Sequence, residues 1–316
     1  MVAPRTVVVV NPNSQGGRLG KRWPELADTI ARVFPFDEAI TAARGDATRL
    51  TREALRAGAE RVIAVGGDGT VNEVVNGFFA DGAPIAPDAA FGLIPFGTGG
   101  DFRRTLQLPN AVPAAAAVIA ANRRKHIDIG KITFVPTATQ TPGSHAVRMF
   151  ANVASFGSSG VISRMVEDSG KRLGKLSFLA ATLRTTWSYQ NQRIQLVFDG
   201  NDRVEATLNT VAIANGRYFG GGMKIAPNAE LDDGSFDVVA IGDLSFAKVL
   251  TSSPRIYTGS HITMPEVSSR RAWVVEAEPI DRATVVDLEI DGEAPGRLPA
   301  KFEVMPTALW AIVPAA

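Results

Sequence analysis

The sequence predicts two domains, an α/β domain built on a parallel sheet and then a mainly antiparallel β domain. In the first part, short apolar runs lead into Gly-rich loops and helical repeats, which is the order typical of a parallel sheet with helices on both faces. Beyond about residue 128, runs of alternating apolar and polar residues are separated by turn residues, as in antiparallel strands. The 316 residues, 45% of them hydrophobic, are enough for two packed cores.

The first part contains three predicted strands and four predicted helices. Continuous apolar runs predict buried strands at residues 6–10, 61–65 and 91–95. Apolar residues at a helical spacing predict helices at residues 23–33, 46–57, 71–78 and 112–122. We assign these elements to a domain at residues 1–128.

The second part is predicted to be rich in hairpins. Alternating runs predict strands within residues 193–200, 202–216, 271–278 and 284–293. One helical stretch, roughly residues 172–189, interrupts them. We assign residues 129–304 to this domain, and a final strand at about residues 305–316 could return to the first one.

Composition and charge exclude several functional classes. A formal net charge of +1 and three histidines give no electrostatic case for nucleic-acid binding, so none is expected. The absence of cysteine excludes disulfides, thiolate zinc sites and a cysteine nucleophile. No apolar run has the length of a membrane span or of a signal-peptide core. We expect a cytoplasmic protein whose membrane contact, where it has one, is peripheral.

Two Gly-rich loops follow predicted strands, "GGDGT" at residues 66–70 and "FGTGGDF" at residues 96–102. In open α/β sheets ligands bind beyond the carboxyl ends of the strands, where glycines let phosphate oxygens approach the backbone and the next helix N-terminus. The dinucleotide fingerprint G-x-G-x-x-G fails at Asn72, and the Lys of a Walker A loop is absent. A phosphate site of another kind is therefore expected.

Each of these loops contains an aspartate, Asp68 in the first and Asp101 in the second. A carboxylate repels a bare pyrophosphate by a few kcal/mol, on the order of the Coulomb energy at an effective dielectric constant near 20. A Mg²⁺ ion between them makes the same carboxylate favourable. The pattern predicts a site for a magnesium–nucleotide complex, while tight turns with both aspartates as helix caps remain the alternative.

At five segments the chain resembles the diacylglycerol kinase family, which includes sphingosine and ceramide kinases and bacterial lipid kinases. The segments are "NPNSQGGR" (11–18), "GGDGTVNEVVNG" (66–77), "PFGTGGDFRR" (95–104), "APNAELDDGSFDV" (226–238) and "DGEAP" (291–295). The resemblance implies a nucleotide domain related to phosphofructokinase and NAD kinase, then a β-sandwich domain for the lipid substrate, with the active site between them. It also implies ATP- and Mg²⁺-dependent phosphorylation of a lipid hydroxyl.

The resemblance also implies roles for individual residues. The essential acids are Asp68, Asp101 and Asp291, which position the nucleotide with its magnesium, and Glu293 is the catalytic base. Asp128 joins the network around the metal, with Arg104 and Lys175 as basic partners. The nucleotide-contacting positions are Asn11, Pro12, Asn13, Ser14, Gly16, Thr41, Gly67, Asp68, Gly69, Thr70, Val71, Asn72, Glu73 and Thr98.

Two further features follow from the resemblance. A structural Mg²⁺ is expected at the turn after residue 229, held by the Asp233 carboxylate and the backbone carbonyls of Glu230 and Ser235, although an Asp-Gly turn without a metal is the alternative. The second loop departs from the family, which usually has Asn before the second aspartate where this chain has Gly100. This departure puts the nucleotide preference in question.

The sequence does not identify the lipid. Residues 171–187 mix basic and apolar side chains at a helical spacing, which suits either a helix on an anionic membrane surface or an amphipathic helix that covers the β domain. The sequence also leaves open whether the chain forms a homodimer. Two other functions also stay open: a kinase of the same superfamily for a soluble substrate such as NAD, and a non-catalytic regulator that binds nucleotide or lipid.

Overall fold

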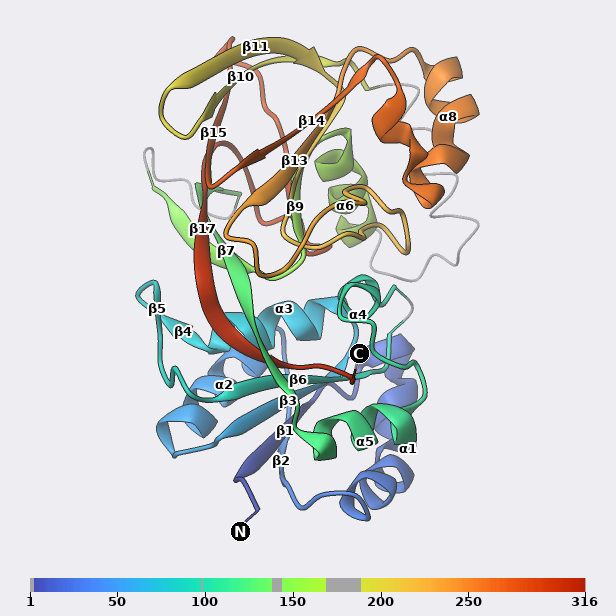
Figure 1. The fold of residues 1–316 in the computed structure, drawn as a ribbon, viewed down its shortest axis with the longest axis vertical. Coiled ribbons are helices and arrows are strands. Elements are labelled where there is room, and N and C mark those ends of the chain that lie inside the picture. The colour runs from blue at the N-terminus through green and yellow to red at the C-terminus, as the bar shows by residue number, and fades with distance from the viewer. Residues whose placement is uncertain (1–2, 98, 138–143, 169–188, 316) are drawn as a thin grey trace.

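A computed structural model describes residues 3–97, 99–137, 144–168 and 189–315. In the lower half of Figure 1, strands pair in parallel in the order β2-β1-β3-β6. They are β1 (Thr6–Val10), β2 (Asp37–Ile40), β3 (Arg61–Gly66) and β6 (Ala90–Pro95). The helices of this half are α1 (Ser14–Ala31), α2 (Asp46–Arg56), α3 (Asp68–Gly77), α4 (Asp101–Thr105) and α5 (Val112–Ala121), and a small ribbon is formed by β4 (Phe79–Ala80) and β5 (Ala83–Pro84).

The parallel strands are covered on both faces, which explains their continuous apolar runs. Successive side chains of a strand point to opposite faces. Val7 and Val9 of β1 accordingly pack in one cluster with α2 and α3. Val8 and Val10 pack in another cluster with α1 and α5. All four valines are buried as a result.

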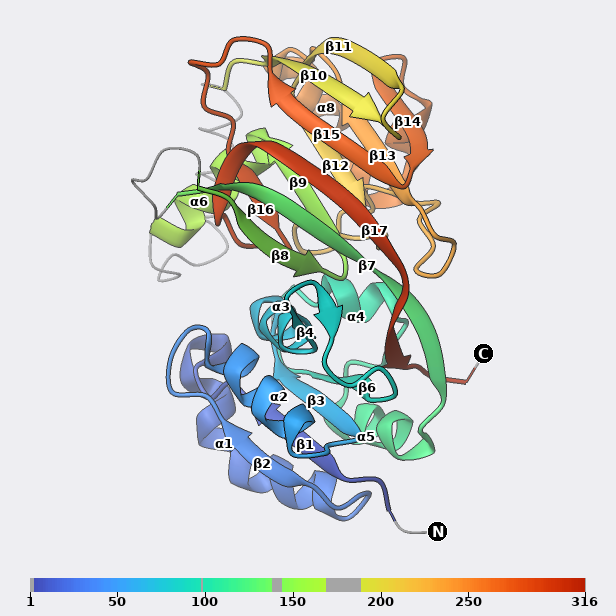
Figure 2. The same cartoon turned by 90° about the vertical axis from the view of Figure 1, so that its left-hand side faces the viewer.

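Two long strands connect this half to the other one. Figures 1 and 2 show β7 (Arg124–Pro136) and β17 (Gly296–Ile312) side by side from one half to the other, and they pair in antiparallel register. Near its end, β17 pairs in parallel with β6 through Trp310 and Ala311. The pairing of β17 with β7 shifts between Met305 and Leu309, where the strand bulges.

The other half is a β-sandwich. One sheet continues from the α/β half and contains β8 (Ala146–Phe150), β10 (Gln192–Phe198), β11 (Asp202–Leu208) and β15 (Val274–Pro279). The second sheet has the order β14-β13-β12-β9-β16, formed by β9 (Val153–Gly157), β12 (Thr210–Ala214), β13 (Phe236–Ile241), β14 (Val267–Ala272) and β16 (Leu288–Ile290). Described helices of this half are α6 (Ser158–Asp168), α8 (Phe246–Thr258) and the short 3₁₀ helix η1 (Ser260–Thr263).

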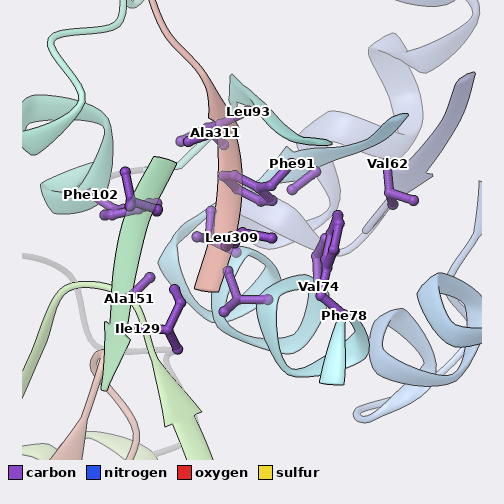
Figure 3. Close-up of a cluster of buried hydrophobic side chains, with 14 of the residues drawn as sticks. Val62, Val74, Phe78, Phe91, Leu93, Phe102, Ile129, Ala151, Leu309 and Ala311 are labelled. Atoms are coloured by element: carbon purple, nitrogen blue, oxygen red, sulfur yellow. The ribbon is translucent and has the colours of Figure 1, made fainter. Parts of the chain in front are cut away.

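Each half of the molecule has its own cluster of buried hydrophobic side chains, and one cluster also reaches the strands that join the halves. A cluster that includes Phe134, Phe156 and Phe302 fills the space between the two sheets of the sandwich. The cluster under α2 and α3 continues into the strands that join the halves, because it contains Ile129 of β7 and Leu309 of β17. Figure 3 shows this junction, with Leu309 and Ala311 near Phe91 and Leu93 of β6. The two halves therefore share apolar packing as well as strands.

The predicted fold class is confirmed: a parallel α/β domain precedes a mainly antiparallel β-sandwich. The first helix differs from its prediction, since α1 begins at Ser14 and ends at Ala31, and Val33 is 41% exposed. The strand β2 was not predicted, because three of its four residues are exposed and carry no apolar pattern. The predicted helix at 172–189 falls almost wholly on residues outside the described part of the chain. Among the described residues, no helix is long and apolar enough to cross a membrane.

Candidate functional site

The two Gly-rich loops lie against each other. They follow the neighbouring strands β3 and β6, which pair in parallel from Arg61 to Gly66. A β-carbon on Gly97 would lie 2.6 Å from the Cα atom of Gly67, and a β-carbon on Gly99 would lie 2.5 Å from Oδ2 of Asp68. The loops therefore need glycine for their own contact, in addition to any approach of a phosphate.

Asp68 joins the first loop to the second. It is the first residue of α3, and its Oδ2 accepts the Gly100 N–H at 2.9 Å while its Oδ1 accepts the Asp101 N–H at 3.1 Å. The carboxylate thus caps the N-terminus of α4, a helix that belongs to the other loop. Each of its oxygens retains a lone pair beyond these two bonds.

Asp101 joins the second loop to the β-sandwich. Its Oδ2 accepts the Gly221 N–H at 2.7 Å, and its Oδ1 accepts a bond from Arg104 at 3.0 Å. Burial raises the pKa of the Asp101 carboxyl, against the bond from Gly221 and the nearby Arg104 charge. Gly220, Gly221 and Gly222 all have positive φ, so they form a third Gly-rich loop at this place. This loop was not predicted, although the run "GGG" is a signal for it.

A hollow opens between the first two loops and the start of α4. It is polar in character, with the Asp68 carboxylate and two guanidinium groups on its wall. Its lining residues are Gly66, Gly67, Asp68, Val71, Leu93, Pro95, Gly97, Gly99, Gly100, Arg103, Arg104 and Asn110.

The loop after β1 packs beside these two loops. The Asn11 side chain donates to Oγ1 of Thr70 at 3.1 Å and accepts the Asn13 N–H at 3.0 Å. Gln15 donates to the Gly97 carbonyl at 3.2 Å. Residues 15–17 have positive φ, which makes the entry to α1 irregular. Four further predicted residues lie in or beside this loop: Pro12 packs on Gly20, Ser14 and Gly16 lie in the first turns, and Thr41 donates its N–H to the Val10 carbonyl.

Helix α3 presents three polar side chains to its surroundings. Asn72 is buried and donates to Oδ2 of Asp291 at 3.0 Å. Glu73 accepts the N–H groups of Gly45 and Ala47 at 2.9 and 3.1 Å. Asn76 exchanges two bonds of 2.9 Å with the backbone of Met149. Of the other predicted positions on this helix, Gly69 lies near Glu293, whereas Thr70 and Val71 are buried.

The turn after β16 places Asp291 among backbone donors. Its Oδ1 accepts the N–H groups of Asn152 and Val153 at 3.2 and 3.0 Å, and its Oδ2 accepts those of Ala151 and the Asn72 amide, both at 3.0 Å. These four bonds use all the lone pairs of the carboxylate. Burial nevertheless raises the pKa of Asp291 to about 6.

Glu289, in β16 just before this turn, is a second buried acid, and it was missed because its position reads as an ordinary strand residue. It accepts the Gly292 N–H at 2.8 Å and has a short contact with the Ser155 hydroxyl. Burial raises the pKa of Glu289 to about 7.

Glu293 lies between two arginines that the sequence analysis did not select. Arg148 of β8 donates to its Oε2 at 2.8 Å, and Arg44 lies 3.1 Å from the same oxygen. Its Oε1 lies 3.7 Å from where a β-carbon would stand on Gly69. Burial raises the pKa of Glu293, but the charges and hydrogen bonds of the two arginines outweigh it, so the pKa is lowered overall.

Asp128 and the turn after residue 229 lie at the junction of β7 and β17. Asp128 is buried, and its oxygens accept the N–H groups of Thr307, in the β17 bulge, and Gly234, both at 2.7 Å. Asp233 accepts the Ser235 N–H at 3.0 Å and pairs with the Arg271 guanidinium. The Glu230 side chain is exposed.

The structure thus brings most predicted site residues into one region around α3. Asp68, Asp101, Asp291 and Glu293 each contact α3, α4 or their loops. The Asp233 turn is connected to this region through Asp128 and Asn215, whose amide donates to the carbonyls of Asp128 and Ala151. Thr98 and Lys175 lie outside the described residues. Within the described part of the chain, no three acidic or histidine side chains form a ready metal cage.

Comparison with known proteins covers both halves of the chain. A family model described as the diacylglycerol kinase catalytic domain matches residues 5–132, and one described as the YegS C-terminal NAD kinase beta sandwich-like domain matches residues 152–313. A diacylglycerol kinase of Mycobacterium tuberculosis is 30% identical over 274 residues, which cover 85% of this chain and 82% of that protein. A diacylglycerol kinase of Staphylococcus aureus is 30% identical over 307 residues, 94% of this chain and 89% of that protein.

A solved structure supports the same fold. The crystal structure of a diacylglycerol kinase from Bacillus anthracis has a TM-score of 0.74 to this chain, with 24% identity over 99% of this chain and 98% of that one. At this identity the similarity shows that the two chains share both halves and their arrangement.

Proposed function

The chain belongs to the diacylglycerol kinase family of lipid kinases, and we propose that it transfers the γ-phosphate of ATP to a lipid hydroxyl, with Glu293 as the base. One observation carries this proposal. The Glu293 carboxylate, which comes from the β-sandwich half, lies beside Gly69 of the loop that opens α3. The expected base and the expected phosphate loop are therefore neighbours, although 224 positions separate them along the chain.

We place the nucleotide phosphates in the hollow between the two Gly-rich loops. The N-terminus of α3 offers unpaired N–H groups and the positive end of the helix dipole. Arg103 and Arg104 on the hollow wall add positive charge for the phosphate oxygens. The same walls carry Asp68, whose negative charge opposes a bare phosphate.

The donor set fits a hard divalent cation bound with the nucleotide. Asp68 retains a lone pair on each oxygen, because each accepts one N–H. Asp101 accepts bonds from Gly221 and Arg104, with the Gly222 backbone as a further donor, so its carboxylate has fewer lone pairs left for a cation. Oxygen ligands of this type suit Mg²⁺, which supplies positive charge to the phosphate oxygens when bound. Asp291 has no lone pair left, so we assign it to holding the turn that carries Glu293.

Glu293 performs the proton step in this proposal. Its lowered pKa keeps it ionised at neutral pH, so that it can accept the proton of the lipid hydroxyl. The lipid oxygen then forms a bond to the γ-phosphorus, and the bond between that phosphorus and ADP breaks. Because phosphoryl transfer has a loose transition state, positioning and charge contribute more than the strength of the base.

The remaining expectations stay proposals. We place the lipid acceptor at a membrane surface, with the Glu293 side of the sandwich toward it. The roles of Thr98, Lys175 and Asp128 around the nucleotide stay predictions. The structural Mg²⁺ at Asp233 also stays a prediction, and no step depends on it, since Asp233 is paired with Arg271 in this structure.

A transfer assay tests the proposed function. Radiolabelled ATP is offered with magnesium to a panel of diacylglycerol, phosphatidylglycerol, ceramide and sphingosine in detergent micelles, with NAD as a soluble acceptor. We expect label in a lipid product with the wild type, and a kcat lower by roughly 10²-fold or more for Glu293→Gln, which keeps the shape but cannot accept the proton. Label in NAD, or in no acceptor, would overturn the proposal.

A further inference from the structure

The Glu293 carboxylate is held by arginines from both halves of the molecule. Arg148 belongs to the β-sandwich and Arg44 to the loop between β2 and α2, and both reach the same oxygen, Oε2. The carboxylate is enclosed, with its side chain 13% exposed, whereas the Arg44 side chain is 65% exposed and reaches in from the surface. The other oxygen, Oε1, is the one that lies near Gly69.

The loop that carries Arg44 is fixed on both sides of this residue. Before it, the N–H groups of Ala42 and Ala43 donate to Oδ2 of Asp46 at 2.8 and 3.1 Å. After it, the N–H groups of Gly45 and Ala47 donate to the carboxylate of Glu73 on α3. Glu73 thereby caps the start of α2 and sets the position of the loop relative to α3.

The strand that carries Arg148 is fixed by the same helix. The Asn76 side chain donates to the Met149 carbonyl and accepts the Met149 N–H, which reproduces the bonds of a neighbouring strand. Asn72 donates to the same carbonyl at 3.3 Å and to Asp291 at 3.0 Å. One turn of α3 therefore holds the loop of Arg44, the strand of Arg148 and the turn of Glu293.

Resting on the proposed function, we propose that Arg44 and Arg148 position the Glu293 carboxylate, and that Asn72, Glu73 and Asn76 of α3 hold the segments of these arginines and of Glu293 in place. The helix that begins at the phosphate loop would then also determine where the base stands. Because the two arginines hold Oε2, Oε1 is directed toward Gly69, where the transferred phosphate is expected. A displacement of about 1 Å at such a site costs on the order of 10²-fold in rate.

The rival role for these arginines is direct contact with the phosphates. Guanidinium groups bind phosphate readily, and an arginine that clamps the transferring group can raise kcat by about 10³-fold or more. The two roles differ in one respect. A positioning arginine acts only through Glu293, whereas a phosphate clamp acts whether or not the base is present.

A double-mutant cycle separates the two roles. Arg44→Met and Arg148→Met are each made in the wild type and in Glu293→Gln, and transfer to the best acceptor of the lipid panel is measured. We expect each single change to lower kcat by roughly 10- to 100-fold with the KM for ATP nearly unchanged. In the Glu293→Gln background the same changes should lower kcat no further.

Conservative and control variants complete the experiment. Arg148→Lys keeps a cation next to the carboxylate and should recover part of the lost kcat, which a loss of folding would not allow. Arg32→Met changes an exposed arginine after α1 and should leave kcat unchanged. The thermal midpoint of each variant shows whether it is folded at the assay temperature.

The outcomes distinguish this inference from the proposed function. Losses that are as large in Glu293→Gln as in the wild type, or losses confined to the KM for ATP, would overturn the positioning role. Full activity of both Met variants would overturn it as well. A wild type that labels no lipid would overturn the proposed function, and with it this inference, a result that no arginine variant can imitate.

Discussion

At the scale of the residue, the contacts of Asp68 show one of its two expected roles and leave room for the other. An aspartate among glycines can cap a helix or bind a metal-bound phosphate. In the structure Asp68 caps a helix, but that helix is α4, which follows the other loop, and not α3, to which Asp68 belongs. Since this cap uses only one lone pair of each oxygen, the carboxylate can still serve a cation on its other side. The two interpretations are therefore compatible.

The presence of glycine at position 100, where the family usually has asparagine, is explained by the local backbone conformation. Its φ of 67° and ψ of 39° are left-handed, a conformation that glycine adopts freely and that asparagine tolerates better than other residues. The family's usual Asn and this chain's Gly thus satisfy the same backbone requirement. The departure needs no change in function to explain it.

Two substitutions at Gly100 test this explanation. Any β-carbon there would lie 3.2 Å from Nε of Arg103, so Ala and Asn share this close contact. We expect Gly100→Ala to lower the free energy of unfolding by about 1 kcal/mol and Gly100→Asn by only a few tenths, because Asn tolerates positive φ. Urea unfolding measures both values. Equal losses for the two variants would show that the backbone conformation is not the reason.

At the scale of the element, β9, β16 and α6 share a buried network around Glu289. The Ser155 hydroxyl contacts both Glu289 and, at 2.8 Å, the hydroxyl of Ser159. One hydroxyl hydrogen cannot serve both bonds, so one partner must donate to Ser155. Either the Ser159 hydroxyl or a protonated Glu289 can supply that donor, and burial favours the neutral acid by raising the pKa of Glu289 to about 7, against the bond from Ser155. We infer that β16 is stabilised when this acid is neutral.

This inference sets the sign of a pH dependence. A carboxyl whose pKa rises from 4.5 to about 7 on folding stabilises the protein fully below pH 4.5, and this contribution is lost as the pH rises through 7. The loss is on the order of 3 kcal/mol. The side chain of Glu289→Gln is neutral at every pH, so this variant should not show the loss of stability with rising pH. Asp291, whose pKa burial raises to about 6, is present in both proteins, and its charge is one of the causes that raise the pKa of Glu289.

Unfolding free energies at pH 5 and pH 8 measure this difference. Relative to the wild type, Glu289→Gln should gain stability between the two pH values. Parallel pH profiles of the two proteins would contradict a protonated Glu289.

At the scale of the whole molecule, local patterns predicted the elements and their class. Buried parallel strands are unbroken apolar runs, and Gly-rich loops mark where two of them end. The predicted bounds of β1, β3 and β6 therefore agree with the observed bounds to within one residue. The irregular entry to α1 and the exposed strand β2 carry no periodic signal, and both were misplaced or missed. Pairing between distant segments, such as β17 with β6, cannot be read from periodicity.

Only those residues of the candidate site that lie in sequence motifs could be predicted from the sequence. Asp68, Asp101 and Glu293 lie in recognisable segments, but Arg44 and Arg148 gain their place at Glu293 only through the folded contacts of α3. Isolated arginines in a sequence are usually surface residues. Both arginines contact one carboxylate because of the tertiary structure, and no local sequence pattern predicts this contact.

We propose above that the two Gly-rich loops hold a nucleoside triphosphate together with a divalent cation, next to Glu293. A crystal soaked with a non-hydrolysable ATP analogue and Mn²⁺, whose anomalous signal locates the metal, measures this directly. We expect triphosphate density in the hollow lined by Gly67, Gly97 and Arg104, with the metal peak beside Asp68. Triphosphate density elsewhere, or a metal peak remote from Asp68, would contradict it.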